Sequence, residues 1–179
     1  MSNFRQYTMG AASSVAMQAA KDLEAYLRNK PETVEVLNVE DNPTCRAQDI
    51  DLIWTVRRPD GSHTVTTIEI KGDRYYRTGN YFLETISNEA KNTPGCFMYT
   101  TANYIFYYFV PEKELHVLPM PATRDWFRQH WLSFPEKKTS TPVGKNEYYV
   151  TVGRLVPRQR VIKEVPGVKI IKLNDMVSK

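Results

Sequence analysis

The chain has 179 residues, with 24 Lys and Arg against 20 Asp and Glu, which gives a formal net charge of +4. This length suits one folded domain and no low-complexity linker divides it, so we expect a single domain over residues 1–179. No apolar run approaches the roughly 18 residues of a membrane span, and the first residues lack the apolar core of a signal peptide. A cytoplasmic protein without a membrane partner is therefore expected.

Hydrophobic spacing predicts a helix and then three strands in the first half of the chain. Apolar residues recur at helical spacing up to about Arg28, with Ser13 and Ser14 as suitable N-cap residues. Alternating apolar residues then predict strands over residues 33–39, 49–54 and 65–71. A turn at residues 58–62 can pair the last two strands as a hairpin.

Acidic side chains interrupt these two strand-like segments. Side chains alternate between the faces of a strand, so Asp49 and Asp51 share one face, as do Glu69 and Lys71. Pairing the strands would gather these groups into one patch. Mg2+ prefers carboxylate oxygens and water, which an aspartate beside a glutamate on the neighbouring strand supplies. Strand parity alone does not distinguish Asp49 from Asp51 as the metal ligand.

The second half of the chain alternates short elements. Residues 80–86 are ambiguous, because Asn80 and Glu84 share a face in a strand and stack one turn apart in a helix. We expect a short helix over residues 100–103, a buried core strand over 104–110 and a helix capped by Thr123. Further strands are expected over residues 115–118, 147–155 and 168–173.

These residues resemble a known enzyme motif. Asp51 with Glu69-Ile70-Lys71 is similar to the motif of the PD-(D/E)XK nuclease superfamily, and Ile50 stands where the family name has a proline. The segment TGNYFLE at 78–84, with the later glycine and threonine pair, resembles small phage and bacterial nuclease-like proteins of this superfamily. The resemblance spans roughly residues 48–109. It implies an α/β fold with a restriction-endonuclease-like core, a central mixed sheet flanked by helices.

The resemblance also implies a function, that of an endonuclease that hydrolyses DNA phosphodiester bonds with Mg2+, for which Mn2+ can substitute. Asp51 and Glu69 would hold the metal, Lys71 would orient the water or stabilise the pentacovalent phosphorus, and Glu84 would complete the catalytic set. Glu24 on the first helix could extend the acids, although an exposed charge is favoured there. Because superfamily members can lose catalysis, a non-catalytic nucleic-acid-binding protein and an α/β protein with neither activity remain alternatives.

Basic residues point to DNA as the partner. Arg74, Tyr75, Tyr76 and Arg77 follow the motif and mix cations with rings that can stack on bases, and Asn80 lies close behind. A solvated loop is the competing interpretation. Other basic residues cluster at 57–58 and 154–163. A homodimer is compatible with this size, but no apolar stripe identifies an interface.

Several classes of site are disfavoured. The chain has no phosphate-binding glycine loop, so nucleotide hydrolysis is not expected, and it has no nucleophile elbow for acyl transfer. Cys45 and Cys96 lack the spacing of a metal site, and the histidines are scattered. Two reduced thiols and no structural zinc are therefore expected.

Overall fold

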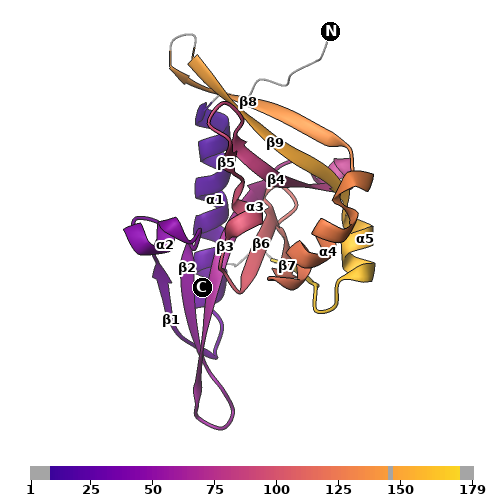
Figure 1. The fold of residues 1–179 in the computed structure, drawn as a ribbon. Helices are drawn as coiled ribbons and strands as arrows, with labels where there is room; N and C mark the ends of the chain where they lie inside the picture. The colour runs from indigo at the N-terminus through magenta and orange to yellow at the C-terminus, as the bar shows by residue number, and fades with distance from the viewer. Residues whose placement is uncertain (1–8, 145–146, 174–179) are drawn as a thin grey trace.

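The computed structural model describes residues 9–144 and 147–173. Over this part of the chain it has the predicted α/β class, with a mixed central sheet flanked by helices (Figure 1). The α-helices are α1 Met9–Arg28, α2 Pro43–Ala47, α3 Cys96–Tyr99, α4 Ala122–His130 and α5 Arg158–Glu164. Short 3-10 helices cover Tyr76–Thr78 and Trp131–Ser133.

The central sheet has six strands in the order β1-β2-β3-β6-β7-β10. The β3–β6 pair is parallel and the other neighbours are antiparallel. Because parallel neighbours need a long crossover, everything between β3 and β6 serves as that connection. The strands are β1 Thr33–Asn38, β2 Leu52–Arg57, β3 His63–Asp73, β6 Tyr104–Phe109, β7 Glu114–Pro119 and β10 Lys169–Lys172.

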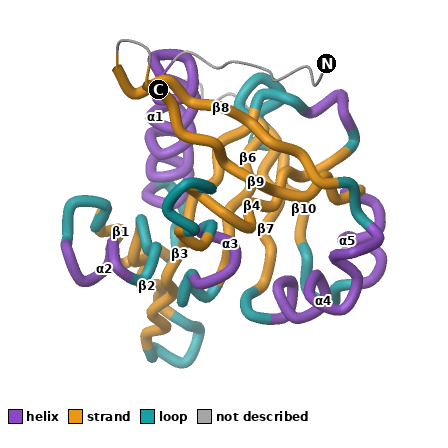
Figure 2. Tube along the Cα trace, turned by 45° about the horizontal axis from the view of Figure 1, so that its top comes forward, coloured by secondary structure: helices purple, strands orange, loops and turns teal. Residues whose placement is uncertain are grey.

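A second, antiparallel sheet of four strands has the order β5-β4-β9-β8 and was not predicted from the sequence. Its members are β4 Asn80–Asn88, β5 Thr93–Pro94, β8 Glu136–Gly144 and β9 Glu147–Pro157. The ambiguous segment 80–86 is therefore a strand. Figures 1 and 2 show β8 and β9 as a long hairpin that lies on the other side of the fold from the β2–β3 hairpin.

Helix α1 packs closely on the central sheet. Ala19, Leu23 and Leu27 are fully buried, as their spacing predicts, and each buried leucine contributes about 1.5–3 kcal/mol. A Cβ added to Gly72 of β3 would lie 2.9 Å from the Ala19 Cβ and 3.0 Å from the Val15 carbonyl oxygen. The glycine therefore allows the helix to lie directly on the strand that carries the motif.

Aromatic side chains fill the other half of the core. Tyr81, Tyr107, Phe109 and Phe127 are each at most 1% exposed and belong to one cluster with residues of both sheets. The Tyr107 hydroxyl donates to the Asp73 carboxylate and accepts from the Phe82 N–H at 3.0 Å. This contact ties β6 and β3 to β4, and it confirms that 104–109 is core.

Four predicted boundaries were wrong. Helix α1 begins at Met9, so Ser13 and Ser14 lie inside it, because the following Gly-Ala-Ala segment continues the helix toward the N-terminus. Strand β2 begins only at Leu52, and Thr123 lies within α4, where its hydroxyl donates to the Pro119 carbonyl at 2.7 Å instead of capping. Residues 100–103 are not helical. Instead, the Thr101 N–H donates to the carbonyl of residue 48 and the Asn103 N–H to the carbonyl of residue 67.

Candidate functional site

The predicted motif residues meet where β2 begins beside the middle of β3. The Asp51 N–H donates to the Ile68 carbonyl at 2.9 Å, and the Ile70 N–H donates to Asp51 Oδ2 at 2.7 Å. Two hydrogen bonds thus hold Asp51 against β3, although Asp51 lies just before the first residue of β2. Glu69 and Lys71 lie on β3 two residues apart, so their side chains share a face as predicted.

Glu69 is the buried centre of the acidic group. Its side chain is 7% exposed, and its Oε2 atom has no hydrogen-bond partner among the described residues. Burial, followed by the charges of Asp51 and Asp49 and a hydrogen bond with Asp51, raises the pKa of Glu69 well above its usual value. An unpaired, buried carboxylate oxygen costs free energy unless a proton or a cation satisfies it.

Asp49 and Asp51 both reach this group, but not by strand alternation. Asp49 has a left-handed φ of 55°, at the turn that joins α2 to β2, so the parity argument does not apply. The Tyr99 hydroxyl donates to Asp49 Oδ1 at 3.4 Å, whereas Oδ2 is buried without a partner among the described residues. Burial and then the charge of Asp51 raise the pKa of Asp49 to about 6. Burial likewise raises the pKa of Asp51.

The second sheet supplies the remaining acid. Glu84 lies in the middle of β4, and its Oε2 is 3.3 Å from Lys71 Nζ. The Cys96 sulfur and then the Glu84 carboxylate raise the pKa of the Lys71 amine well above its usual value, so the side chain is a cation. Asp51, Glu69, Lys71 and Glu84 are therefore gathered at the junction of the two sheets.

Cys96 is the site residue that sequence reasoning missed. Its Sγ atom and carboxylate oxygens of Asp49 and Glu69 all lie within 4.8 Å of one another. Cys96 opens α3, directly after Gly95, which crosses β4 so closely that an added Cβ would lie 2.4 Å from the Glu84 carbonyl oxygen. The glycine before Cys96 was the available signal, since glycine in such a position allows close backbone approach.

The carboxylate oxygens and the sulfur of this group differ in how well they suit Mg2+. The unpaired oxygens of Glu69 and Asp49, with the adjacent Asp51 carboxyl, suit a hard cation that prefers oxygen ligands. Cys96 does not suit Mg2+, because thiolate is a soft ligand and burial raises the pKa of this thiol. Asp49, Asp51 and Glu69 could therefore supply oxygen ligands to such a cation, with Cys96 outside them.

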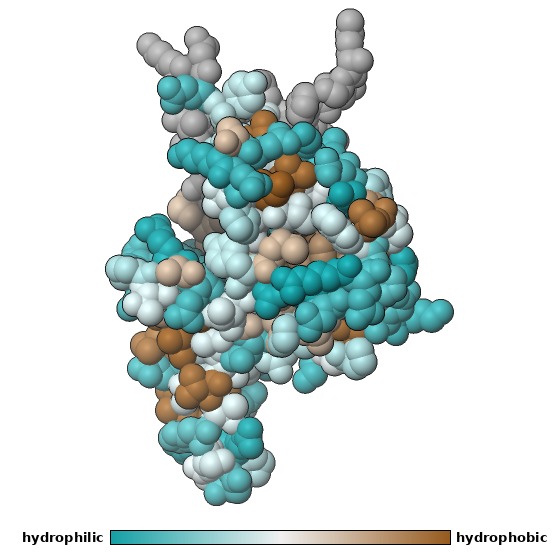
Figure 3. Space-filling view, in the orientation of Figure 1, coloured by the Kyte–Doolittle hydropathy of each residue, from teal (hydrophilic) through white to brown (hydrophobic). Residues whose placement is uncertain are grey.

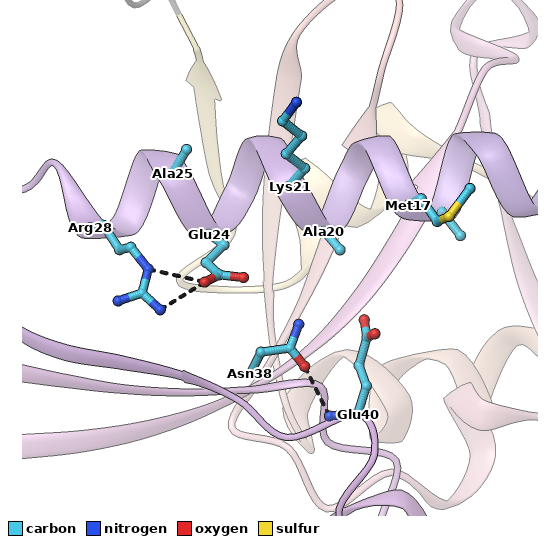
Figure 4. Close-up of a pocket in the computed structure, with 9 residues that line it drawn as sticks. Met17, Ala20, Lys21, Glu24, Ala25, Arg28, Asn38 and Glu40 are labelled. Atoms are coloured by element: carbon cyan, nitrogen blue, oxygen red, sulfur yellow. Dashed lines mark hydrogen bonds and ion pairs between the residues drawn. The ribbon is translucent and has the colours of Figure 1, made fainter.

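A groove between α1 and the segment after β1 lies near these acids (Figure 4). Glu24 accepts from Arg28 Nε at 3.0 Å and from Nη2 at 2.7 Å, so it forms an ion pair on the helix. Across the groove, the Glu40 N–H donates to Asn38 Oδ1 at 3.1 Å. Burial and then the Asp51 charge raise the pKa of Glu40. The groove thus reaches toward Asp51 through Glu40, whereas Glu24 is paired with Arg28.

The predicted DNA-binding loop directly follows β3. Arg74 and Arg77 are exposed, and the Arg74 guanidinium lies 5.2 Å from the Tyr75 ring. Tyr76, in contrast, packs edge-to-face on Phe109 at 5.2 Å between ring centroids. Asn80 begins β4, four residues or roughly 13 Å from Glu84 along the strand. The loop offers cations beside the site, but Tyr76 is part of the core.

Basic residues near the C-terminus are largely engaged within the protein. Arg154 donates to the Phe134 carbonyl at 3.0 Å and to Glu136 at 3.1 Å. Arg158 donates to the Tyr76 carbonyl at 2.7 Å and lies 4.0 Å from the Tyr76 ring. The cluster at 154–160 therefore has mainly structural contacts.

The face in Figure 3 is mostly hydrophilic, with separate apolar patches.

Comparisons with known proteins do not identify a relative: no protein-family model, no curated protein and no solved structure matches this chain.

Both cysteines are free thiols in the structure, as predicted. Among residues 9–144 and 147–173, no helix is long and apolar enough to cross a membrane.

Proposed function

We propose that this protein is a metal-dependent endonuclease of the PD-(D/E)XK type that hydrolyses phosphodiester bonds of DNA. The observation that supports it most is the meeting of Asp51, Glu69 and Lys71 at one place, where the buried Glu69 Oε2 has no partner within residues 9–144 and 147–173. Such an oxygen in the interior opposes folding unless a proton or a ligand satisfies it, which favours a cation-binding site over a sheet that merely solvates its charges.

Each residue has a distinct role in this proposal. Asp51 and Glu69 would hold the cation through their adjacent carboxylates, and the Ile70 N–H fixes the orientation of Asp51. A bound Mg2+ would supply a Lewis acid that lowers the pKa of water and offsets charge on the phosphate. Lys71 donates hydrogen bonds to the attacking water or to the phosphate oxygens, and Glu84 holds the Lys71 ammonium in place.

The DNA backbone would approach from the side of the loop after β3. Exposed Arg74 and Arg77 follow Lys71 closely along the chain and can contact phosphates on either side of the bond to be cut. Arg57 and Arg58 at the end of the β2–β3 hairpin are exposed and can extend the contact. Phosphate contacts of this kind carry no sequence information, so we propose a nuclease that binds the DNA backbone without reading its sequence.

The test is cleavage of supercoiled plasmid and of single-stranded DNA with Mg2+, with Mn2+ and with EDTA. D51N, E69Q and K71Q are compared with two controls, D125N on α4 and K169Q on β10, which remove exposed charges. We expect the protein to cleave DNA and EDTA to abolish the cleavage. Each site variant should lower the cleavage rate by at least a hundredfold, and the two controls should retain it.

Two outcomes would contradict the proposal. Cleavage that persists in D51N and K71Q would place the chemistry elsewhere or in a contaminant. DNA binding without cleavage under any metal condition would instead support a non-catalytic binding protein, which a filter-binding assay of the same samples detects.

A further inference from the structure

A second set of donors lies beside the residues of the proposed magnesium site. Asp49, Glu69 and Cys96 each bring one ligand atom into a group whose members lie within 4.8 Å of one another. They come from the α2–β2 turn, from β3 and from the start of α3, so the fold rather than local sequence spacing assembles them.

Two independent observations indicate that this group faces a ligand. The Glu69 side chain is more than nine-tenths buried, and its Oε2 atom is unpaired among the described residues. Asp49 Oδ2 is likewise buried and unpaired, even though Tyr99 holds the other oxygen of this carboxylate. Two buried acceptors without a partner among the described residues, beside a sulfur, form a group that a bound cation can complete.

The chemistry of the donors selects the class of cation. Sulfur is a poor ligand for Mg2+ and Ca2+, whereas Zn2+, Co2+ and similar ions accept mixed sulfur and carboxylate ligands. Ligand atoms around tetrahedral Zn2+ are about 3.6 Å apart for bonds of about 2.1–2.3 Å. Because the observed atoms lie within 4.8 Å of one another, the group needs to contract by at most about 1 Å to reach this spacing.

We propose that Asp49, Glu69 and Cys96 bind a thiophilic divalent cation such as Zn2+, in a site that shares Glu69 with the proposed Mg2+ site. Binding forms one metal–sulfur bond and releases the thiol proton of Cys96 to solvent. The positive charge of Lys71 favours the thiolate, which offsets part of the cost of deprotonating a thiol in this position.

A regulatory consequence follows from the shared ligand, and it rests on the proposed function. Glu69 belongs to both sets, so the two cations compete for its carboxylate. Zn2+ at Asp49, Glu69 and Cys96 would then inhibit Mg2+-dependent cleavage. The protein would be active in Mg2+ and turned off by free Zn2+.

The direct test titrates the reduced, metal-free protein with Co2+ and follows the near-ultraviolet charge-transfer absorption of a cobalt–thiolate bond. We expect one Co2+ per chain, release of protons measured with an indicator dye, and displacement by Zn2+. C96S and C96A should lose the band, and D49N and E69Q should weaken binding at least tenfold. C45S is the matched control, because Cys45 is the other free thiol and lies on α2 outside the group.

D51N separates this inference from the proposed function, since it should keep the cobalt band and lose cleavage. In active protein, the Zn2+ concentration that halves cleavage should rise at least tenfold in C96S, with each variant normalised to its own activity in Mg2+. Circular dichroism establishes that each variant is folded. A thiolate band that survives in C96S and C96A, a band lost in C45S, or Co2+ binding without any thiolate band would overturn the inference.

Discussion

The Lys71 ammonium lies 3.3 Å from the Glu84 carboxylate and so joins β3 of the central sheet to β4 of the second sheet. The Lys71 side chain is 31% exposed and that of Glu84 15% exposed, which leaves the pair at the edge of the interior. In an ordinary surface pair, such a contact contributes little to stability. Its position beside Asp51 and Glu69 gives it a role in holding Lys71 toward the acids.

The first prediction concerns this contact. E84Q should lower Mg2+-dependent cleavage by about 10- to 100-fold, because a misplaced ammonium stabilises the transition state less well. Unfolding in urea should change by less than about 1 kcal/mol, since the pair is only partly buried. E89Q is the control, because Glu89 also pairs with a lysine, Lys138, at an exposed position just beyond β4. Equal loss of activity in both variants would show that the effect is not specific to Lys71.

A second prediction distinguishes Asp49 from Asp51 as the metal ligand, a choice that the sequence left open. D51N should abolish cleavage in Mg2+, whereas D49N should keep it within about tenfold, because Asp51 is the acid hydrogen-bonded to Glu69 and fixed by Ile70. Plasmid cleavage at several Mg2+ concentrations measures both effects. The reverse order would make Asp49 the principal ligand.

A third prediction concerns the free energy stored at Glu69. In the absence of metal, E69Q should raise the midpoint of thermal unfolding, because it removes an ionisable carboxyl that is buried beside the charges of Asp51 and Asp49; the gain is about 1–3 kcal/mol. Millimolar Mg2+ should raise the midpoint of the unaltered protein and leave E69Q unchanged, since a ligand stabilises only the state that binds it. An E69Q variant less stable than the unaltered protein without metal would contradict this account.

The fourth prediction concerns Gly95, whose close approach to Glu84 places Cys96 in the site. An added Cβ would lie 2.4 Å from the Glu84 carbonyl oxygen, so G95A should cost about 1–3 kcal/mol and displace β4 or α3. Gly61 is a control with a φ of +83°, where no atom of the described part of the chain lies within 4 Å of an added Cβ. Alanine there costs only about 1 kcal/mol of backbone strain. Urea unfolding should distinguish them, and only G95A should impair cleavage.

Local patterns in the sequence were sufficient to predict much of the central sheet and to single out the motif residues. Apolar spacing identified α1, β3, β6 and β7 because each buries a regular face. Asp51, Glu69, Lys71 and Glu84 were all singled out, and the structure brings them together. Charged residues at strand spacing supported Asp51, Glu69 and Lys71, whereas Glu84 rested on the resemblance of the segment TGNYFLE.

The rest depended on contacts between distant segments. Whether residues 80–86 form a strand is settled by pairing with β9, about seventy residues later, which no local pattern reveals. Cys96 joins the acids only because α3 crosses β4 at Gly95. Asp49 reaches them through a left-handed turn that was taken for a strand.

A final prediction concerns pH and a buried histidine away from the acids. His116 is 2% exposed; the Tyr81 hydroxyl lies 2.6 Å from its Nδ1, and Glu114 Oε1 lies 2.8 Å from its Nε2. Tyr81 comes from β4 and Glu114 from β7, whereas Arg158 of α5 adds a positive charge and Lys172 of β10 lies 3.8 Å from Glu114. Burial outweighs the effect of Glu114 and lowers the pKa of His116, so the ring is neutral, accepts from Tyr81 and donates to Glu114.

Because the folded pKa of His116 is below the unfolded value of about 6.5, the unfolded chain binds more protons in this range. The contribution of His116 to stability is therefore complete above about pH 6.5 and is lost as the pH falls toward the folded pKa. The raised pKa values of Asp49 and Glu69 act in the opposite direction, so the loss is measured as a difference between variants. In urea unfolding, the stability advantage of the unaltered protein over H116Q should be present at pH 8 and shrink toward pH 5. H63Q is the control, because His63 is exposed at the start of β3. A decline that is the same in H116Q as in the unaltered protein would assign the pH dependence to other groups.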